Sequence, residues 1–107
     1  MTDKIVVYST CSNAEEAKKL ATQLVEKRLA ACVNVIRGVD SYYWWQGKVQ
    51  NEEEILLLIK TSRELFGRLR TQLETLHSYE IPELIAVPIV EGAPNYLDWM
   101  ERELTPK

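Results

Sequence analysis

The segment Ser41-Tyr42-Tyr43-Trp44-Trp45-Gln46-Gly47-Lys48-Val49 is the strongest indication of the fold, because it places four aromatic rings directly before a Gln-Gly turn signal. Runs rich in strand-forming residues lie on either side of it, at positions 32–36 and 55–59. Two such runs that flank a short glycine turn are typical of a β-hairpin. The sequence therefore predicts a hairpin with an aromatic tip.

The predicted hairpin is longer than the domain that carries it. A first strand running from Cys32 to Trp45 would span roughly 45 Å at about 3.3 Å per residue. A compact domain of this size has a radius of gyration of about 13 Å and hence a diameter of roughly 34 Å. Because monomers rarely expose an apolar patch of this kind, we expect the tip to pack on another copy of the chain.

Length and composition indicate one globular domain over residues 1–107. A hydrophobic fraction of 46% with 27% charged residues is ordinary for such a domain. The net charge of −3 argues against a nucleic-acid partner. No signal peptide or long apolar segment is recognisable, and two widely separated cysteines do not make a disulfide framework. We therefore expect a cytoplasmic protein that does not contact membranes.

The first half of the chain is predicted to form a strand, a helix and the hairpin. The apolar run 5–8 predicts a short strand, and Asn13 followed by Glu16 resembles a capping box at a helix start. The residues behind it repeat with helical period: Ala17, Leu20, Ala21, Leu24 and Val25. The hairpin follows this helix.

The second half is predicted to form a helix, a strand and a short helix. Thr61 and Glu64 form a second predicted capping box, ahead of leucines at helical spacing. The run 84–90 predicts a strand that Pro88 confines to a sheet edge or a bulge. Pro94 suits the first position of a third, short helix that extends through Leu104.

The resulting order β-α-β-β-α-β predicts an α+β fold of the ferredoxin-like type with an extra C-terminal helix. Such a fold places both principal helices on one face of the sheet. Yet the run 55–59 is apolar on both alternations, which is typical of a strand buried on both faces. We expect subunits to pack against the second face with closed cyclic symmetry.

Five short segments also carry a resemblance to a known family. They are Ala30-Ala31-Cys32-Val33-Asn34, Tyr43-Trp44-Trp45-Gln46-Gly47-Lys48, Ile59-Lys60-Thr61, His77-Ser78-Tyr79-Glu80-Ile81-Pro82-Glu83-Leu84 and Tyr96-Leu97-Asp98-Trp99. In this order they resemble the CutA divalent-cation tolerance family. The resemblance implies a ferredoxin-like homotrimer, similar in architecture to the P-II nitrogen-signalling proteins. It also implies binding of divalent metal ions, chiefly copper, with zinc as another candidate.

His77 is the only histidine and stands where the second helix is expected to end. Glu80 and Glu83 follow it, and imidazole with carboxylate donors suits copper or zinc. The alternative is a residue that caps the helix. With the copper association that the resemblance implies, we predict His77 as the principal copper ligand, assisted by Glu80, Glu83 or the Cys11 thiolate.

The two cysteines are interpreted differently. Cys11 precedes a helix N-terminus, which stabilises a thiolate. The thiol ligand of the family, however, falls at Ser9 in this chain, so Cys11 is alternatively an idle loop residue. We interpret Cys32 as a small core residue. No Cys-x-x-Cys or His-x-x-His spacing occurs, which argues against a structural zinc site.

The remaining candidates concern a cleft between subunits. Trp44 and Trp45 point to opposite faces of a strand and are predicted anchors of a core or an interface. Lys60 would reach into the cleft beside Tyr79 and Glu83, or else extend to the surface. Trp45 is a further candidate for this cleft. The acidic run 52–54 is interpreted as a solvated strand edge.

Among functions, an enzyme has the least support. A single histidine, no Ser-His-Asp set and no phosphate-binding loop among four glycines leave no catalytic machinery. The leading prediction is a copper-binding protein of metal tolerance. The alternatives are a P-II-like signalling protein that binds a small anion in the cleft through Lys60 and Arg37, and a stable scaffold for other proteins.

Overall fold

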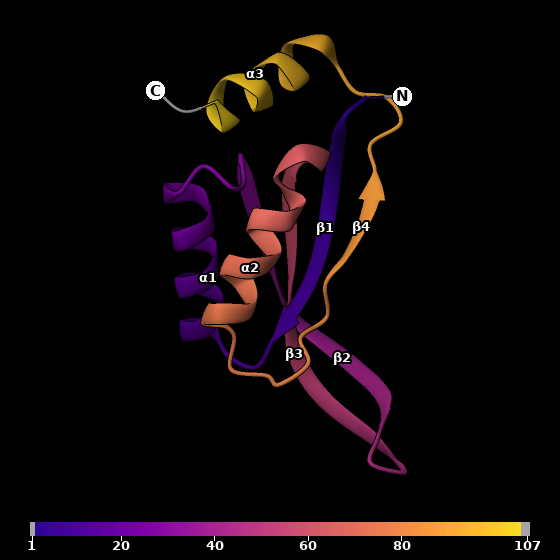
Figure 1. Ribbon diagram of the computed structural model, residues 1–107. Coiled ribbons are helices and arrows are strands. Elements are labelled where there is room, and N and C mark those ends of the chain that lie inside the picture. The colour runs from indigo at the N-terminus through magenta and orange to yellow at the C-terminus, as the bar shows by residue number, and fades with distance from the viewer. Residues whose placement is uncertain (1, 106–107) are drawn as a thin grey trace.

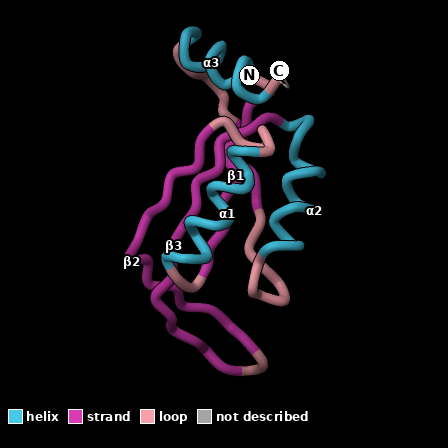
Figure 2. Tube along the Cα trace, turned by 90° about the vertical axis from the view of Figure 1, so that its left-hand side faces the viewer, coloured by secondary structure: helices cyan, strands magenta, loops and turns pink. Residues whose placement is uncertain are grey.

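Residues 2–105, which the computed structural model describes, fold around a four-stranded antiparallel sheet with strand order β2-β3-β1-β4. The elements are β1 (Lys4–Cys11), α1 (Ala14–Glu26), β2 (Cys32–Trp45), β3 (Lys48–Ser62), the 3-10 turn Arg63–Leu65, α2 (Phe66–Leu76), β4 (Ile85–Pro88) and α3 (Pro94–Leu104). Figures 1 and 2 show α1 and α2 side by side over the same face of the sheet, with α3 across one end. The predicted ferredoxin-like order with an extra helix is confirmed.

The core lies between this face of the sheet and the two helices. Every second residue of β3 from Ile55 to Ile59 points into it, and Val7 of β1 lies opposite Ile59. The helices bury residues spaced three or four apart: Ala17, Leu20 and Leu24 on α1, and Leu69 and Leu73 on α2. Each fully buried leucine or isoleucine contributes about 1.5–3 kcal/mol. The helical and strand periods of the sequence therefore converge on one core.

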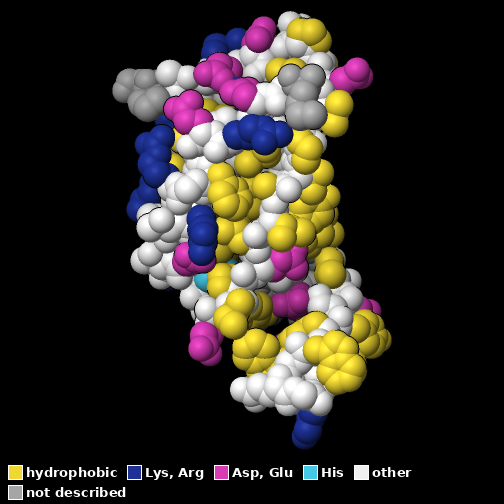
Figure 3. All heavy atoms as spheres, turned by 45° about the vertical axis from the view of Figure 1, so that its right-hand side comes forward, with side chains coloured by type: hydrophobic (Ala, Val, Ile, Leu, Met, Phe, Trp, Pro, Cys, Tyr) yellow, Lys and Arg dark blue, Asp and Glu magenta, His cyan; other side chains and the backbone are white. Residues whose placement is uncertain are grey.

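The other face of the sheet is largely uncovered. Leu56 and Leu58 of β3 are half-buried there, and Ile85 and Val87 of the edge strand β4 are exposed. Figure 3 shows hydrophobic side chains gathered over the sheet and again at the hairpin, with acidic side chains between them. The doubly apolar pattern of β3 thus marks a surface that no segment within residues 2–105 fully covers.

The hairpin extends beyond the globule as predicted. β2 spans Cys32–Trp45, and its register with β3 closes at Trp45 opposite Lys48. Gln46 and Gly47 both have positive φ, 49° and 78°, as a two-residue hairpin turn requires. The molecule is 44 Å long and only 25 × 23 Å across, because the hairpin projects from one end (Figure 1). A register shift between Ile36 and Val39, unpredicted from the sequence, interrupts β2 near Gly38.

One predicted helix cap is confirmed and the other is wrong. Asn13 Oδ1 accepts the Glu16 backbone N–H at 2.8 Å, as a capping residue should. Thr61, by contrast, still belongs to β3, and its hydroxyl donates to the Leu29 carbonyl at 2.7 Å inside the core. The 3-10 turn therefore separates β3 from α2, and Thr61 is not available as a cap.

Two further expectations need correction. The fourth strand covers only Ile85–Pro88 rather than residues 84–90, although it is an edge strand as Pro88 indicated. Cys32 is half-buried rather than a core residue, because the β2 register places it opposite Lys60 on the uncovered face and turns Val33 towards the core. α3 begins at Pro94 as predicted. No helix within residues 2–105 combines the length and the apolar character needed to cross a membrane.

Candidate functional site

A cavity of about 740 Å³ lies between the hairpin and the loop that follows α2. The hairpin contributes Ser41, Tyr42, Tyr43, Trp45, Gln50, Glu52 and Glu54, the loop contributes Tyr79, Glu80, Ile81, Pro82 and Glu83, and β1 contributes Thr10. The register pairs Tyr43 with Gln50 and Ser41 with Glu52, so these hairpin residues share one side of the ribbon. The overhang of the hairpin therefore creates one wall of the cavity.

The walls of the cavity are acidic. Glu52, Glu54, Glu80 and Glu83 line it, and no Lys or Arg of the described chain does. The Tyr79 hydroxyl donates to Glu54 Oε2 at 2.7 Å, and the Tyr43 hydroxyl donates to Glu52. Two tyrosine–carboxylate pairs therefore stand along the cavity, each with the acid as acceptor.

These pairs affect the ionisation of the tyrosines. The hydrogen bond to Glu52 raises the pKa of Tyr43 to about 12. Burial, followed by the hydrogen bond to Glu54, raises the pKa of Tyr79 well above its usual range. Burial and the nearby Glu54 charge raise the pKa of Glu83 above its ordinary value. Burial and neighbouring carboxylates therefore act in the same direction on these three groups, because both disfavour a further negative charge.

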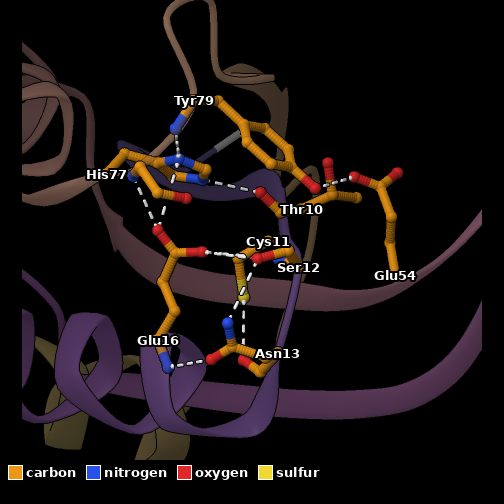
Figure 4. Close-up of polar contacts among 9 residues, drawn as sticks. Thr10, Cys11, Ser12, Asn13, Glu16, Glu54, His77 and Tyr79 are labelled. Atoms are coloured by element: carbon orange, nitrogen blue, oxygen red, sulfur yellow. Dashed lines mark hydrogen bonds and ion pairs between the residues drawn. The ribbon is translucent and has the colours of Figure 1, made fainter.

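His77 holds the loop that forms the second wall. It follows the last residue of α2, its side chain is fully buried, and its Nε2 lies 2.7 Å from the Thr10 carbonyl of β1 (Figure 4). Its Nδ1 accepts the Tyr79 backbone N–H at 3.0 Å. A carbonyl on one nitrogen and an N–H donor on the other require the neutral ring with its proton on Nε2. The imidazole thus joins β1 to the loop.

Glu16 supports the same junction from α1. Its Oε2 accepts the Ser78 backbone N–H at 2.7 Å and lies 3.7 Å from His77 Nδ1, while Oε1 accepts the Ser12 N–H at 3.3 Å (Figure 4). Burial alone would raise the pKa of Glu16, but the hydrogen bonds from Ser78 and Ser12 outweigh it and lower the pKa. Sequence reasoning identified Glu16 as a helix cap and missed this second contact with the loop.

The four predicted metal ligands occupy two different places. Glu80 and Glu83 line the cavity, whereas His77 and Cys11 lie behind it. Among residues 2–105, no three His, Cys, Asp or Glu side chains come close enough together to hold a metal ion. The ligand set therefore remains a prediction that requires a change in geometry.

The expected thiolate at Cys11 is not what the environment favours. Cys11 is the last residue of β1 and fully buried, and its Sγ lies 3.8 Å from the Asn13 carbonyl. Burial, followed by the negative charge of Glu16, raises the pKa of Cys11 to about 11. The thiol is therefore protonated at neutral pH, and the helix N-terminus does not overcome its desolvation.

The predicted cleft residues are only partly together. Trp45 and Tyr79 line the same cavity, but Lys60 does not. The Lys60 ammonium instead lies 5.7 Å from the centre of the Tyr96 ring, on α3 at the opposite end of the sheet (Figure 1). Trp44 does not line the cavity and remains 74% exposed.

Sequence reasoning missed Thr10, Glu52 and Glu54 as residues of the site. The interpretation of residues 52–54 as a solvated edge is wrong for Glu54, which is only 6% exposed. A signal was present in the alternation of β3, since residues 52 and 54 share a face with Leu56 and Leu58. A carboxylate on a face that is expected to be covered needs a hydrogen-bond donor or a cation beside it, because burying an unpaired charge is costly.

A family model described as CutA1 divalent ion tolerance protein matches residues 5–103. The chain belongs to this family. It is 47% identical over 95 residues to the divalent-cation tolerance protein CutA of Thermus thermophilus, covering 89% of this chain and 92% of that one. The crystal structure of CutA from Xylella fastidiosa superimposes with a TM-score of 0.94 at 41% identity, covering 97% of this chain and all of the other.

A plant relative is longer. The chloroplastic protein CutA of Arabidopsis thaliana is 47% identical over 97 residues, which are 91% of this chain but 53% of the relative. The present chain thus spans about half the length of this CutA protein. The resemblance drawn from the five sequence segments is confirmed at the level of family and fold.

Proposed function

We propose that this CutA-family chain is a non-enzymatic, divalent-cation-binding protein that contributes to tolerance of metal ions. The observation behind this proposal is the cavity lined by four carboxylates and by no Lys or Arg of the described residues. A concave surface of one charge sign raises the local concentration of counter-ions. Copper(II) stands at the top of the divalent affinity order and is the ion we expect to bind most tightly.

We infer that His77 is the principal copper ligand. In the neutral ring that the two contacts require, Nδ1 has the lone pair that a metal would take, and this lone pair now accepts the Tyr79 N–H. Copper must therefore displace the hydrogen bond from the Tyr79 N–H to His77 Nδ1, and losing this bond costs about 0.5–1.5 kcal/mol. Glu80 and Glu83 belong to the same loop and would move with it. Cys11 would join only by losing its proton.

Titration with copper(II) tests this assignment. His77→Ala should weaken binding most and Glu83→Gln less, with Cys11→Ser as a third variant. Glu53→Gln is the matched control, because Glu53 lies on β3 but does not line the cavity. Binding by His77→Ala as tight as that of the parent, in a protein with unchanged circular dichroism, would show that His77 only holds the loop.

The pH dependence gives a second check on the same ligand. A ring nitrogen must be unprotonated to bind metal, so affinity should decline as the solution becomes acidic. An affinity that stays constant from pH 7.5 to pH 5.5 would instead indicate carboxylate ligands alone.

We further propose that the chain acts as a homotrimer in the cytoplasm. The uncovered apolar face, the projecting hairpin and the open edges of β2 and β4 support association. Two cysteines without a disulfide fit a reducing compartment. Sedimentation at micromolar concentration should give three times the chain mass, and Trp44→Ala together with Trp45→Ala should lower it if either ring anchors the interface. A parent that sediments as a monomer would refute the assembly.

The alternative of a P-II-like protein that binds a small anion has less support. Lys60, its main predicted contact, lies against Tyr96 and away from the cavity. An anion placed among four carboxylates would meet repulsion without compensation.

A further inference from the structure

The cavity has the dimensions of a small-molecule site. Its volume of about 740 Å³ falls within the range of about 300–1,000 Å³ that ligand pockets of proteins occupy. A single metal ion would fill a small fraction of it. The walls are therefore better understood by asking which larger molecule matches their chemistry.

The lining combines aromatic rings with carboxylates. Tyr42, Tyr43, Trp45 and Tyr79 contribute rings, and the acids come from both the hairpin and the loop. Ring faces attract organic cations, and carboxylates accept strong hydrogen bonds from ammonium groups. Ile81 and Pro82 add apolar surface between them. Such walls fit a cation with an aliphatic body.

Glu54 is a buried carboxylate that no Lys, Arg or His side chain of residues 2–105 pairs with. Its side chain lines the cavity, the residue is only 6% exposed, and Oε2 accepts the Tyr79 hydroxyl. No ion pair in the described part of the chain includes it. A carboxylate buried to this degree is ordinarily paired with a cation. A ligand that brings an ammonium group to Glu54 supplies that pair.

Thr10 adds a second polar group at the same place. It is 8% exposed and lines the cavity, and its carbonyl is engaged by His77. No hydrogen bond found within residues 2–105 uses its hydroxyl. Figure 4 shows this side chain on the side of β1 that faces the Tyr79–Glu54 contact. A hydroxyl that faces a cavity without a protein partner can accept an ammonium hydrogen.

A compact metal ion does not match this arrangement as it stands. Divalent ions need several donors at about 2.0–2.6 Å from one point, and no three acidic or sulfur or imidazole side chains of the described chain converge in this way. The negative charges are instead spread from Glu52 and Glu54 on β3 to Glu80 and Glu83 on the loop. Separated acids fit a ligand with separated positive charges.

We propose that this cavity binds a linear aliphatic polyamine, with one ammonium group between Glu54 and Thr10 and the others towards Glu52 and Glu83. Its methylene chain lies against Trp45 and Pro82. This goes beyond the divalent-cation function, because it requires neither a metal nor displacement of the Tyr79 N–H from His77.

Calorimetric titration with spermidine tests the proposal, in about 150 mM salt to screen diffuse attraction and with EDTA to remove divalent ions. Saturable binding of one spermidine per chain is expected, and an uncharged diol of matching length should not bind. Glu54→Gln should weaken binding about tenfold or more, since hydrogen bonds to charged groups are the strong ones. Glu83→Gln should act in the same direction and is the safer variant, because Glu83 is much less buried than Glu54.

The matched control is Glu53→Gln, which removes the same charge from the same strand but from outside the cavity. It should change the affinity less than twofold. Absence of saturable binding would overturn the proposal, as would equal binding of the diol. Equal weakening by Glu53→Gln and Glu83→Gln would also overturn it, because that pattern describes counter-ions spread over an acidic surface. None of these outcomes depends on whether copper binds.

Discussion

The two halves of β3 lie in opposite surroundings. From Ile55 to Ser62 the strand crosses the globule, and every second side chain is buried beneath α1 and α2. From Lys48 to Glu53 it runs out along the hairpin, where every residue is exposed or half-buried. Glu54, buried next to Tyr79, marks the change. The inner half thus buries one of its two rows of side chains in the core, whereas the outer half buries neither row.

The largest effect is expected from Leu57→Ala. Leu57 is 0% exposed in the core, and such truncations cost about 2–5 kcal/mol of unfolding free energy. Leu56→Ala is the matched control on the uncovered face and should cost less in the dissociated chain. Urea unfolding at several protein concentrations measures both. If the cost of Leu56→Ala rises to that of Leu57→Ala as the chain associates, the second face of the sheet lies inside an interface. Equal costs for the two variants at high dilution would contradict the difference between the two faces.

A smaller effect is expected from Tyr79→Phe, which acts where the two halves of β3 meet. Tyr79→Phe removes the hydroxyl that donates to the buried Glu54 carboxylate, and losing a hydrogen bond to a buried charged group costs upwards of about 1.5 kcal/mol. Tyr43→Phe removes the equivalent contact with the exposed Glu52 further out along the hairpin and should leave the unfolding free energy unchanged. Denaturation curves that moved equally for the two variants would mean that the cavity is uniformly solvated.

A third effect concerns pH and arises from Cys11, the last residue of β1, which pairs with Ile55 of the inner half of β3. The pKa of Cys11 rises from 9.0 to about 11 because the buried site favours the neutral thiol. The folded state therefore retains a proton that the unfolded chain releases, and the stability from this group is complete below pH 9 and is lost as pH rises towards 11. The slope reaches at most about 1.4 kcal/mol per pH unit.

Subtracting the curve of Cys11→Ala from that of the parent isolates this thiol from the tyrosines, which titrate in the same range. The difference should decline between pH 9 and pH 11. A difference that stays constant would mean that water reaches Cys11 in the folded state.

Patterns that depend on neighbours in the sequence predicted the structure well. The alternation of 55–59, the Asn13 cap and the Gln46-Gly47 turn were read correctly because each is decided within a few residues. The Thr61 cap failed because a carbonyl from Leu29, far away in the chain, takes its hydroxyl. Local propensity gives way where a distant segment offers a better partner.

The site was harder to predict for the same reason. Glu54 is buried only because a loop 25 residues further along folds back over it. The Cys11 thiolate was expected from its place before a helix, but the end of β1 lies beneath the helices and loses its water. Which acids converge on a cavity is a property of the tertiary fold, and only the parity of Glu52 and Glu54 on β3 pointed to it.

The junction at His77 also bears on motion in the loop. Residues 77–84 contain no helix or strand, yet Glu16 accepts the amide of Ser78 and His77 accepts the amide of Tyr79. These two amides should therefore exchange with deuterium slowly, on the timescale of the adjoining sheet rather than of an open loop. The second wall of the cavity would then behave as a fixed surface, and ligand binding would cost little conformational entropy in this loop.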